Sequence, residues 1–287
     1  MSLMDLALTD DDFTRLRRLI HEEAGITLAP WKRGLVRGRL ARRLEELGLR
    51  TFAEYHARLV DDASRDELTH FINAMTTNKT EFFREPHHFD YVRDAWLPSR
   101  GPCRRRTDRR LRLWSAGCST GEEPYTLAMT LLDAIDVTVG WDIRILATDI
   151  DTDVLAHAEQ AVYATEQLTP VPSALVRRYF LRGTGERSGL VRVKPDVRAL
   201  VTFRHLNVLD DPWPMHGRFD AIFCRNVLIY FDRATQQRVL SRLVHQLADG
   251  GMLFLGHSET VHGMVEGLTP AGATIYRRAG TRAAPAR

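Results

Sequence analysis

Residues 114–125 read WSAGCSTGEEPY, and this stretch gives the first indication of the fold. A short apolar run ends here in small residues, which allow the backbone to approach a ligand closely. Ser119 or Thr120 is expected to cap the next helix, with Glu122 or Glu123 completing a capping box. Because carboxylates repel phosphate, the loop suits a cationic ligand, such as an ammonium group, or a ribose near the helix start. For the loop taken alone, a glycine-containing turn with a routine capping box is the alternative.

Downstream of this loop, strand and helix patterns alternate. The expected strands are LRLWSAG, IRILATDID, FDAIFCRNVLIYF and, as the last one, MLFLGHSE. The expected helices are PYTLAMTLLDAI, DVLAHAEQAVY and RATQQRVLSRLVHQLADGG, the last ending at a glycine pair. Such alternation predicts parallel pairing and a doubly wound α/β sheet with a mostly parallel strand arrangement.

Polar residues follow two of these strands, at the sheet edge where ligands of open α/β folds bind. Asp149 can accept hydrogen bonds from both hydroxyls of a ribose, whereas Asp151 is expected to cap the following helix. Arg225 and Asn226 come directly after a buried strand and are placed for a ligand or substrate. Tyr230 and Phe231 then supply aromatic surface near a reacting centre, or alternatively belong to the core.

The first 75 residues show helix patterns and no strand pattern. Thr9 is the expected N-cap of a first helix and Gly25 its stop signal. Pro30 opens a second helix that ends at Gly48, and two further helices are expected over residues 51–60 and 65–75. Apolar residues recur in the second helix at helical spacing: Leu35, Val36, Leu40, Leu44 and Leu47.

These patterns divide the chain into an N-terminal all-α domain over residues 1–85, a linker over 86–110 and an α/β domain over 111–287. Within the α/β domain, residues 177–203 have Gly-rich turns between short β-prone pieces. We interpret them as a small antiparallel β insertion beside the main sheet, with an irregular loop as the alternative.

The composition is that of an ordinary globular protein, 44% apolar and 27% charged. The chain contains no run of about eighteen apolar residues and no basic region followed by a long apolar run near its start. A cytoplasmic location without membrane insertion is therefore expected. The three cysteines, Cys103, Cys118 and Cys224, form no CxxC pair, which indicates neither a metal site nor a disulfide framework.

Positive charge is unevenly distributed, although the formal net charge is only +3. Residues 31–60 contain eight Lys and Arg against three Glu, and residues 100–112 read RGPCRRRTDRRLR. The second run raises the possibility of a nucleic-acid partner, but a solvated linker is the favoured interpretation, and the small net charge argues against polyanion binding by the whole molecule.

Taken together, these residues resemble the CheR family, the methyltransferases of bacterial chemotaxis that esterify glutamates on chemoreceptors. The GxGxG motif of many other methyltransferases is absent, and AGCSTGEE stands in its place, as in this family. The matching strings occur in the family's order and extend to about residue 276: TTNKTEFFRE, WSAGCSTGEEPY, ATDID, YFLRGTGERSGLVRV, FDAIFCRNVLIYFD and GHSE.

The resemblance implies S-adenosylmethionine as the cofactor. It implies that TTNKTEFFRE, residues 76–85, reaches from the interdomain region over that cofactor. The implied positions are Asn78, Thr80 and Arg84 as cofactor contacts, Glu123 near the methionine moiety, Asp149 at the ribose, Asn207 and Val208 around the adenine, Arg225 and Asn226 as further contacts, and Tyr230 close to the transferred methyl.

The implied reaction is methyl transfer from a sulfonium to a glutamate carboxylate. Such a carboxyl has a pKa of about 4.3 in solution, so it is already the nucleophile at neutral pH and no general base is required. Proximity and in-line orientation can then contribute on the order of 7–11 kcal/mol. We hypothesise that Arg84 and Tyr230 orient the carboxylate and shape the methyl site without exchanging protons.

A receptor glutamate lies among other acids, and the basic second helix is complementary to such a surface. The alternative is a solvated helix face, and Glu45 and Glu46 directly after the arginines leave the receptor open. The docking candidates are Arg33, Arg37, Arg39, Arg42 and Arg43.

The string RGTG lies in the expected β insertion and resembles a β-subdomain that, in some relatives, binds a tethering pentapeptide at a receptor C-terminus. Such a peptide is expected to add as a strand to an edge and to raise the effective substrate concentration. The rival functions are a nucleic-acid methyltransferase and a non-enzymatic cofactor sensor. The intact Arg84, Asn226 and Tyr230 argue against the sensor.

Overall fold

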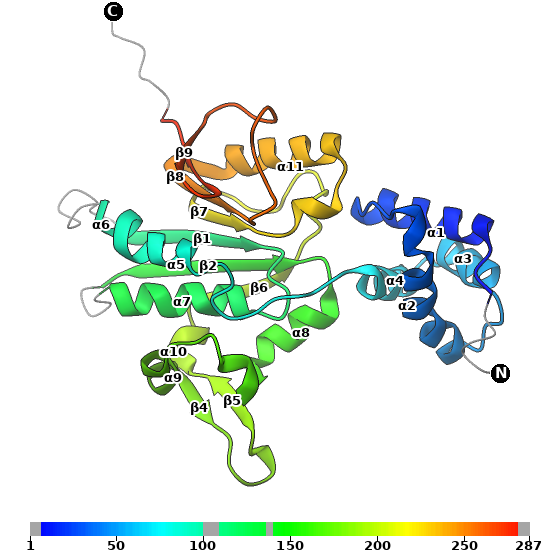
Figure 1. Cartoon of the computed structure of the whole chain (residues 1–287), viewed down its shortest axis with the longest axis horizontal. Coiled ribbons are helices and arrows are strands. Elements are labelled where there is room, and N and C mark those ends of the chain that lie inside the picture. The colour runs from blue at the N-terminus through cyan, green and yellow to red at the C-terminus, as the bar shows by residue number, and fades with distance from the viewer. Residues whose placement is uncertain (1–6, 100–108, 136–139, 281–287) are drawn as a thin grey trace, which may run out of the picture.

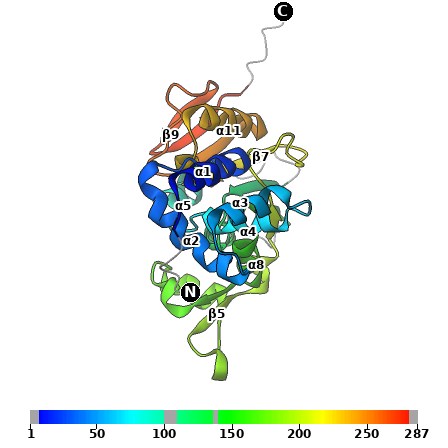
Figure 2. The same ribbon diagram turned by 90° about the vertical axis from the view of Figure 1, so that its right-hand side faces the viewer.

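The computed structural model describes residues 7–99, 109–135 and 140–280. Figure 1 shows a helical domain, coloured blue to cyan, beside one end of a large twisted sheet, with a smaller sheet projecting below it. Figure 2 looks from the helical domain onto the sheet. None of the helices formed by the described residues combines the length and apolar character of a membrane span. Residues 100–108, which hold Cys103 and most of the basic run, lie outside the described ranges.

Helices α1 (Asp10–Ala24), α2 (Arg33–Glu46), α3 (Phe52–Asp61) and α4 (Asp66–Met75) form the N-terminal domain, as predicted. Thr9 caps α1 in a capping box with Asp12, and Gly25 ends α1 with a left-handed φ of 69°. Pro30 opens a short 3-10 helix, Pro30–Lys32, in front of α2. Leu35 is 42% exposed, so it does not join the buried apolar stripe of α2 that the pattern predicted.

After α4, a strap over residues 76–86, irregular at first and turning from residue 82 on, leads to α5 (His87–Tyr91), a π-helical segment (Val92–Trp96) and α6 (Leu97–Ser99). Their Phe89, Val92 and Trp96 are buried in the same hydrophobic cluster as strand residues of the large sheet. This part of the expected linker is therefore packed into the core of the α/β domain.

The large sheet has seven strands in the order β6-β2-β1-β7-β8-β10-β9. The first five strands in this order pair in parallel, and β10 pairs antiparallel with both β8 and β9. This mostly parallel sheet confirms the predicted fold class. The strands are β1 (Arg110–Ala116), β2 (Asp142–Asp149), β6 (Val201–His205), β7 (Phe219–Cys224), β8 (Leu247–Leu255), β9 (Leu268–Gly272) and β10 (Ile275–Arg278).

Helices cover both faces of the sheet. Successive residues of β7 point to opposite faces, so Phe223 packs in one hydrophobic cluster with Leu127 and Leu131 of α7 (Glu122–Ala134). Its neighbour Ile222 packs in another cluster with residues of α11 (Arg233–Gln246). The third helix, α8 (Thr152–Gln160), follows β2. Two layers of helices around a parallel sheet give the doubly wound arrangement.

Two boundaries differ from the prediction. Helix α11 ends at Gln246 instead of at the glycine pair, because Leu247 pairs with Phe219 and already belongs to β8. Strand β8 is not the last strand, because β9 and β10 follow and add to the sheet edge. The segment LTPAGATIYRR, with its Pro and Gly, gave no strand signal in the sequence.

A second, antiparallel sheet has the order β3-β5-β4 and projects away from α11, as both ribbon views show. Its strands are β3 (Val162–Ala164), β4 (Phe180–Arg182) and β5 (Leu190–Val193), with α9 (Ser173–Tyr179) and α10 (Pro195–Arg198) beside them. The small sheet thus begins before the expected range 177–203. The end of that range lies in β6, which pairs with β2 of the main sheet.

Candidate active site

A cavity of about 260 Å³ lies at the carboxyl ends of the parallel strands, between the sheet and the helical domain. The strand order turns here, because β1 has β2 on one side and β7 on the other. This is the topological switch point at which open α/β sheets bind ligands. The loops after β1, β2, β6 and β7 line the cavity, together with Ala24 and Ile26 at the end of α1 and the strap after α4.

The loop after β1 is tightly packed. Gly117 has a φ of 78°, and a Cβ on it would lie 2.3 Å from Val227 Cγ2. The predicted capping box at Ser119 or Thr120 is wrong. The N-cap of α7 is Gly121, which lies in the left-handed region and has no side chain that could accept a capping hydrogen bond. Ser119 instead uses its backbone N–H to donate to Asp149 Oδ2 (2.8 Å), and its hydroxyl donates to the Asn78 carbonyl (3.0 Å).

The two glutamates of this loop point to different places. Glu122 is buried away from the cavity, where Thr120 and Gln167 donate to its carboxylate. Glu123 lines the cavity and is paired with Arg225 (Nη1 to Oε2, 3.0 Å). Burial raises the pKa of Glu123, and the charge of Arg225 opposes that effect. Only one of the two carboxylates therefore faces the cavity, and it shares the Arg225 cation with Glu85.

Asp149 ends β2 and lies on the cavity wall, 7% exposed. Its oxygens accept backbone N–H groups from Ser119 and Asp151 (3.0 Å), and each oxygen keeps a lone pair for a further donor. Burial, with the charge of Asp151, raises its pKa, and the backbone N–H groups of Asp151, Ser119 and Ile150 counter the rise. Asp151 caps α8, as predicted, and also accepts a hydrogen bond from Asn78 Nδ2 at 2.7 Å.

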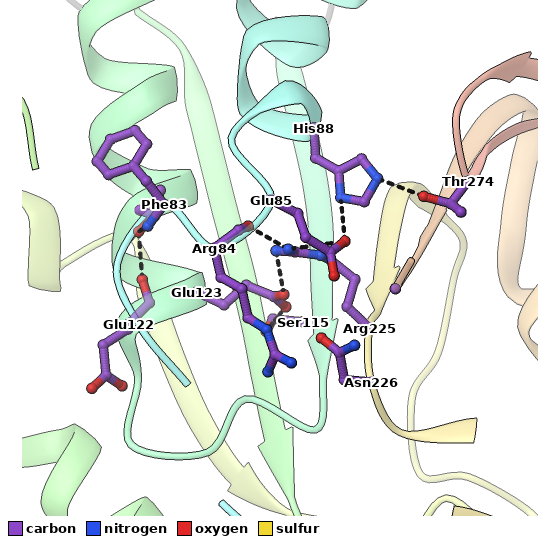
Figure 3. A network of polar contacts seen from close by, with 12 residues as sticks. Phe83, Arg84, Glu85, His88, Ser115, Glu122, Glu123, Arg225, Asn226 and Thr274 are labelled. Atoms are coloured by element: carbon purple, nitrogen blue, oxygen red, sulfur yellow. Dashed lines mark hydrogen bonds and ion pairs between the residues drawn. The ribbon is translucent and has the colours of Figure 1, made fainter. Parts of the chain in front are cut away.

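Arg225 is the centre of the network in Figure 3. Its side chain is 2% exposed, and its guanidinium lies between Glu123 and Glu85 (Nη2 to Oε2, 3.3 Å). The same nitrogen donates to the carbonyl oxygen of Arg84. Arg225 therefore ties the end of β7 to the first turn of α7 and to the strap.

The strap carries Arg84 over the cavity. Its half-buried side chain lines the cavity, and Nη1 donates to the Lys79 carbonyl at 2.7 Å. Phe83 and Glu85, on either side of it, both have a φ of 56°, an uncommon conformation for residues other than glycine. Asn78 and Thr80, earlier on the strap, also face the cavity.

The ends of β6 and β7 contact the helical domain directly. Asn207 Nδ2 donates to the Glu23 carbonyl of α1 at 2.7 Å, and its Oδ1 accepts the Leu209 N–H. The Thr27 N–H donates to the Tyr230 carbonyl at 2.8 Å. Tyr230 is half-buried and lines the cavity, with its hydroxyl 3.4 Å from the Thr77 carbonyl. Phe231 also lines the cavity, but it is 9% exposed and packs in the core. It is therefore both an aromatic surface of the site and a core residue, the two alternatives that the sequence left open.

The five docking candidates of α2 fall into two groups. Arg39 donates to the Met75 and Thr76 carbonyls, and Arg43 is paired with the buried Glu67 at 2.7 Å, so both stabilise the helical domain. Arg37 and Arg42 are exposed, whereas Arg33 is half-buried and donates to the Leu8 carbonyl. Arg33 is also paired with Asp10, and Arg42 with the exposed Glu46.

The structure brings together every residue that the sequence singled out for cofactor contact or catalysis. They all line this one cavity: Asn78, Thr80, Arg84, Glu123, Asp149, Asn207, Val208, Arg225, Asn226 and Tyr230. Sequence reasoning missed the residues behind them, chiefly Glu85, His257 and Glu259. The string GHSE pointed to the last two without indicating a role.

The donor set fits a nucleoside with a charged tail. Asp149 offers free carboxylate lone pairs beside an apolar wall of Leu206 and Val208, which suits a ribose and a base. Glu123 and Arg225, which line the same cavity, carry both signs of charge, which suits an amino-acid end. The described residues include no group of three or more His, Cys, Asp or Glu side chains that could hold a metal ion. Burial raises the pKa of the Cys118 and Cys224 thiols well above the usual value.

Comparison with known proteins places the chain in a family. Residues 78–277 match the CheR methyltransferase SAM-binding domain, and residues 11–76 match the CheR methyltransferase all-alpha domain. A chemotaxis protein methyltransferase of Klebsiella aerogenes is 46% identical over 94% of this chain and 90% of its own length. The protein of that name from Escherichia coli is 45% identical over 94% of this chain and 92% of its own.

A chemotaxis protein methyltransferase 2 of Pseudomonas aeruginosa is 45% identical over 93% of either chain. Among solved structures, a magnesium protoporphyrin IX methyltransferase of Synechocystis has a TM-score of 0.32 and 14% identity, covering 86% of this chain and 67% of that one. That structural likeness is too low to support an argument. The sequence identities of about 45% are high enough to support one, and they agree with the cavity described above. The chain belongs to the CheR methyltransferase family and is an S-adenosylmethionine-dependent chemotaxis protein methyltransferase.

Proposed function

We propose that the enzyme transfers a methyl group from S-adenosylmethionine to glutamate side chains of chemoreceptors and forms glutamate methyl esters. The observation that supports this most directly is that Arg84 and Tyr230 line the same cavity as Asp149 and Glu123. A cation and a phenol in the lining of a nucleoside site suit an acceptor that is itself an anion. A chemotaxis role for the curated relatives points to receptors as the source of that anion.

When bound, S-adenosylmethionine supplies an electrophilic methyl group on a sulfonium. In our proposal Asp149 holds the ribose, Asn207 and Val208 flank the adenine, and Glu123, Arg225, Asn226, Asn78 and Thr80 surround the rest. The guanidinium of Arg84 neutralises and orients the acceptor carboxylate. Tyr230 limits the directions from which that carboxylate can approach the methyl group. No proton transfer is needed, because a glutamate is ionised at pH 7. The protein contributes orientation and the exclusion of water.

Docking of the receptor is proposed to use the surface arginines of α2, Arg33, Arg37 and Arg42. Arg37 and Arg42 are exposed, and Arg42 is held near Glu46 only by a surface pair of little energetic weight. They are therefore free to meet an acidic receptor helix. Arg39 and Arg43 support this helix from within the domain and act on docking only through its shape.

The small sheet is proposed to bind a receptor C-terminal pentapeptide. Its order β3-β5-β4 leaves β4 as an edge strand, and Leu181 on β4 is 48% exposed. An extended peptide can add to such an edge through main-chain hydrogen bonds and place an apolar side chain beside Leu181. Tethering of this kind would raise the local enzyme concentration near cytoplasmic receptor domains. No nucleic-acid, metal or membrane partner forms part of the proposal.

The test is incubation with cofactor labelled on the methyl group and with receptor-containing membranes, followed by alkaline treatment. Methyl esters release volatile methanol, and we expect this release from receptor bands only. Label that stays with nucleic acid, with a steep salt dependence of binding, would favour the nucleic-acid methyltransferase. Tight cofactor binding without transfer to any receptor would favour a sensor.

A further inference from the structure

We propose that the loop Gly256–Glu259, directly after β8, is the positioning element of the active site. It contacts two separate segments of the cavity wall, on the side away from the cavity. Glu259 fixes the backbone of residues 226–229, and His257 fixes the strap that carries Arg84. Neither residue lines the cavity, so each acts through groups that do.

Glu259 is a buried carboxylate, 6% exposed, that accepts four backbone N–H groups. Its Oε2 accepts from Asn226 (2.9 Å) and Gly256 (2.7 Å). Its Oε1 accepts from Leu228 (2.7 Å) and Ile229 (3.3 Å). An ionised carboxylate has about four acceptor sites, and bonds to a charged acceptor are the strong ones. One side chain therefore binds three amides of the turn between β7 and α11 and ties them to Gly256 of its own loop.

This turn needs such support, because Asn226 has a φ of 60°. A left-handed conformation in a residue other than glycine persists when its surroundings over-determine it. Gly256 contributes by leaving space, since a Cβ there would lie 2.5 Å from Asn226 Nδ2 and 2.8 Å from its backbone nitrogen. Glu259 and Gly256 together fix how Asn226 meets the cavity, and the following Tyr230 is fixed with it.

The second contact of the loop reaches the strap. His257 donates to Glu85 twice, from Nδ1 to Oε1 (2.8 Å) and from its backbone N–H (3.3 Å). Glu85 is buried, 6% exposed in its side chain, and its other oxygen faces Arg225. Burial raises the pKa of Glu85, but the His257 hydrogen bonds and the Arg225 charge outweigh that and lower it. The carboxylate is thus ionised and able to hold both partners.

Through this series of contacts the loop fixes the position of the Arg84 backbone over the cavity. Arg225 donates to the Arg84 carbonyl (Figure 3), and His257 donates to Glu85 next to it, so the strained φ values of Phe83 and Glu85 are held from two directions. Loss of the His257 contact leaves Glu85 with Arg225 (3.3 Å) and the more distant Nδ1 of His88 (3.6 Å). The Arg84 side chain would then sample positions away from the acceptor, which lowers turnover more than cofactor affinity.

The first experiment compares the purified full-length wild type with Glu259→Gln and with the control Glu266→Gln, an exposed glutamate seven residues further on. In Glu259→Gln the amide nitrogen must face two backbone N–H groups. We expect hydrogen exchange of peptides covering residues 225–230 to accelerate about tenfold or more and S-adenosylhomocysteine affinity in calorimetry to fall about tenfold, while peptides from α1 and α11 are unchanged. The control should match the wild type. Unchanged local exchange in Glu259→Gln overturns the proposal.

The second experiment uses His257, which is 65% exposed in its side chain and tolerates replacement even if Glu259→Gln does not fold. His257→Ala should lower turnover about tenfold at saturating cofactor with little change in S-adenosylhomocysteine affinity. His257→Asn should restore most of it, because the amide nitrogen can occupy the place of Nδ1. Equal turnover in His257→Ala and wild type, or equal loss in both variants, overturns the clamp.

The turnover measurements rest on the proposed receptor substrate, whereas the exchange and binding measurements do not. If the receptor is not the substrate, the wild type itself shows no turnover, and the exchange data still decide the role of the loop.

Discussion

Arg225 Nη1 lies 3.0 Å from Glu123 Oε2, and both side chains are largely shielded from solvent, at 2% and 12% exposure. With Glu85 on the other side, one buried guanidinium serves two carboxylates. An arrangement of this kind is costly to break, because removal of the cation leaves two buried anions facing each other.

Arg225→Met should therefore lower the free energy of unfolding by about 3–5 kcal/mol, since methionine fills the space but pairs with neither carboxylate. Urea denaturation followed by circular dichroism measures the change. The control Arg15→Met removes a surface pair with Asp11 and should cost about 1 kcal/mol or less. Equal losses in the two variants would show that the buried network contributes no more than a surface pair.

Arg84→Ala should reduce turnover on receptor membranes about 100-fold at saturating cofactor, because the acceptor carboxylate loses its cation. Binding of S-adenosylhomocysteine should weaken much less. The control Arg93→Ala removes an exposed arginine paired with Asp90 and Asp94 and should leave turnover unchanged. Full turnover in Arg84→Ala would rule out the orienting role.

Charge reversal on α2 tests receptor docking. The double variant Arg37→Glu, Arg42→Glu should lower kcat/KM for receptor membranes about tenfold at low salt and flatten its salt dependence, because both residues are exposed. Cofactor affinity should stay at the wild-type value. The double variant Arg238→Glu, Arg277→Glu makes the same net charge change at exposed residues outside α2 and serves as the control. A similar loss in that control would assign the effect to net charge alone.

The stability of the protein should decline in mild acid because of His88. Burial first, and then the charges of Arg225 and His87 against that of Glu85, lower the pKa of His88 to about 3. A histidine in the unfolded chain has a pKa of about 6.5, so the unfolded state binds more protons between these values. The free energy of unfolding therefore falls as the pH drops below about 6.5, by about 1.4 kcal/mol per pH unit from this group.

Urea denaturation at pH 7.5 and 5.5 measures this effect. His88→Gln should lose about 1.4 kcal/mol less than the wild type between the two pH values. His216→Gln, at an exposed histidine, should keep the wild-type pH dependence. An unchanged pH dependence in His88→Gln would mean that the buried imidazole is not the responsible group.

The parts of the fold that were predicted correctly depend on local signals. The cap of α1 at Thr9 and its end at Gly25 involve residues within a few positions of each other. The boundary between α11 and β8 was wrong because the pairing of Leu247 with Phe219, which is distant in sequence, overrides the helical pattern. The capping box after β1 was wrong for the same reason, since the partners of Ser119 are Asn78 and Asp149.

The site shows the same division. Motif recognition selected residues that all reach one cavity, because the carboxyl ends of parallel strands converge there. It gave no means of separating Arg39 and Arg43, which are engaged inside the helical domain, from the arginines at its surface. It also missed Glu85 and Glu259, whose hydrogen-bond partners lie far away in the chain and follow from the folded arrangement alone.

The contacts of Glu23 and Thr27 with Asn207 and Tyr230 use main-chain atoms on the helical side, a carbonyl and an N–H. These two hydrogen bonds do not depend on which side chains the helical domain carries at residues 23 and 27. Other contacts with the α/β domain do use side chains, those of Asn73 with Thr152 and of His21 with Asp232. The outer surface of the helical domain can therefore diverge during evolution while these residues and the main-chain contacts keep the cavity wall in place. Exchange of helical domains between relatives that serve different receptors should accordingly transfer receptor preference and leave the chemistry intact.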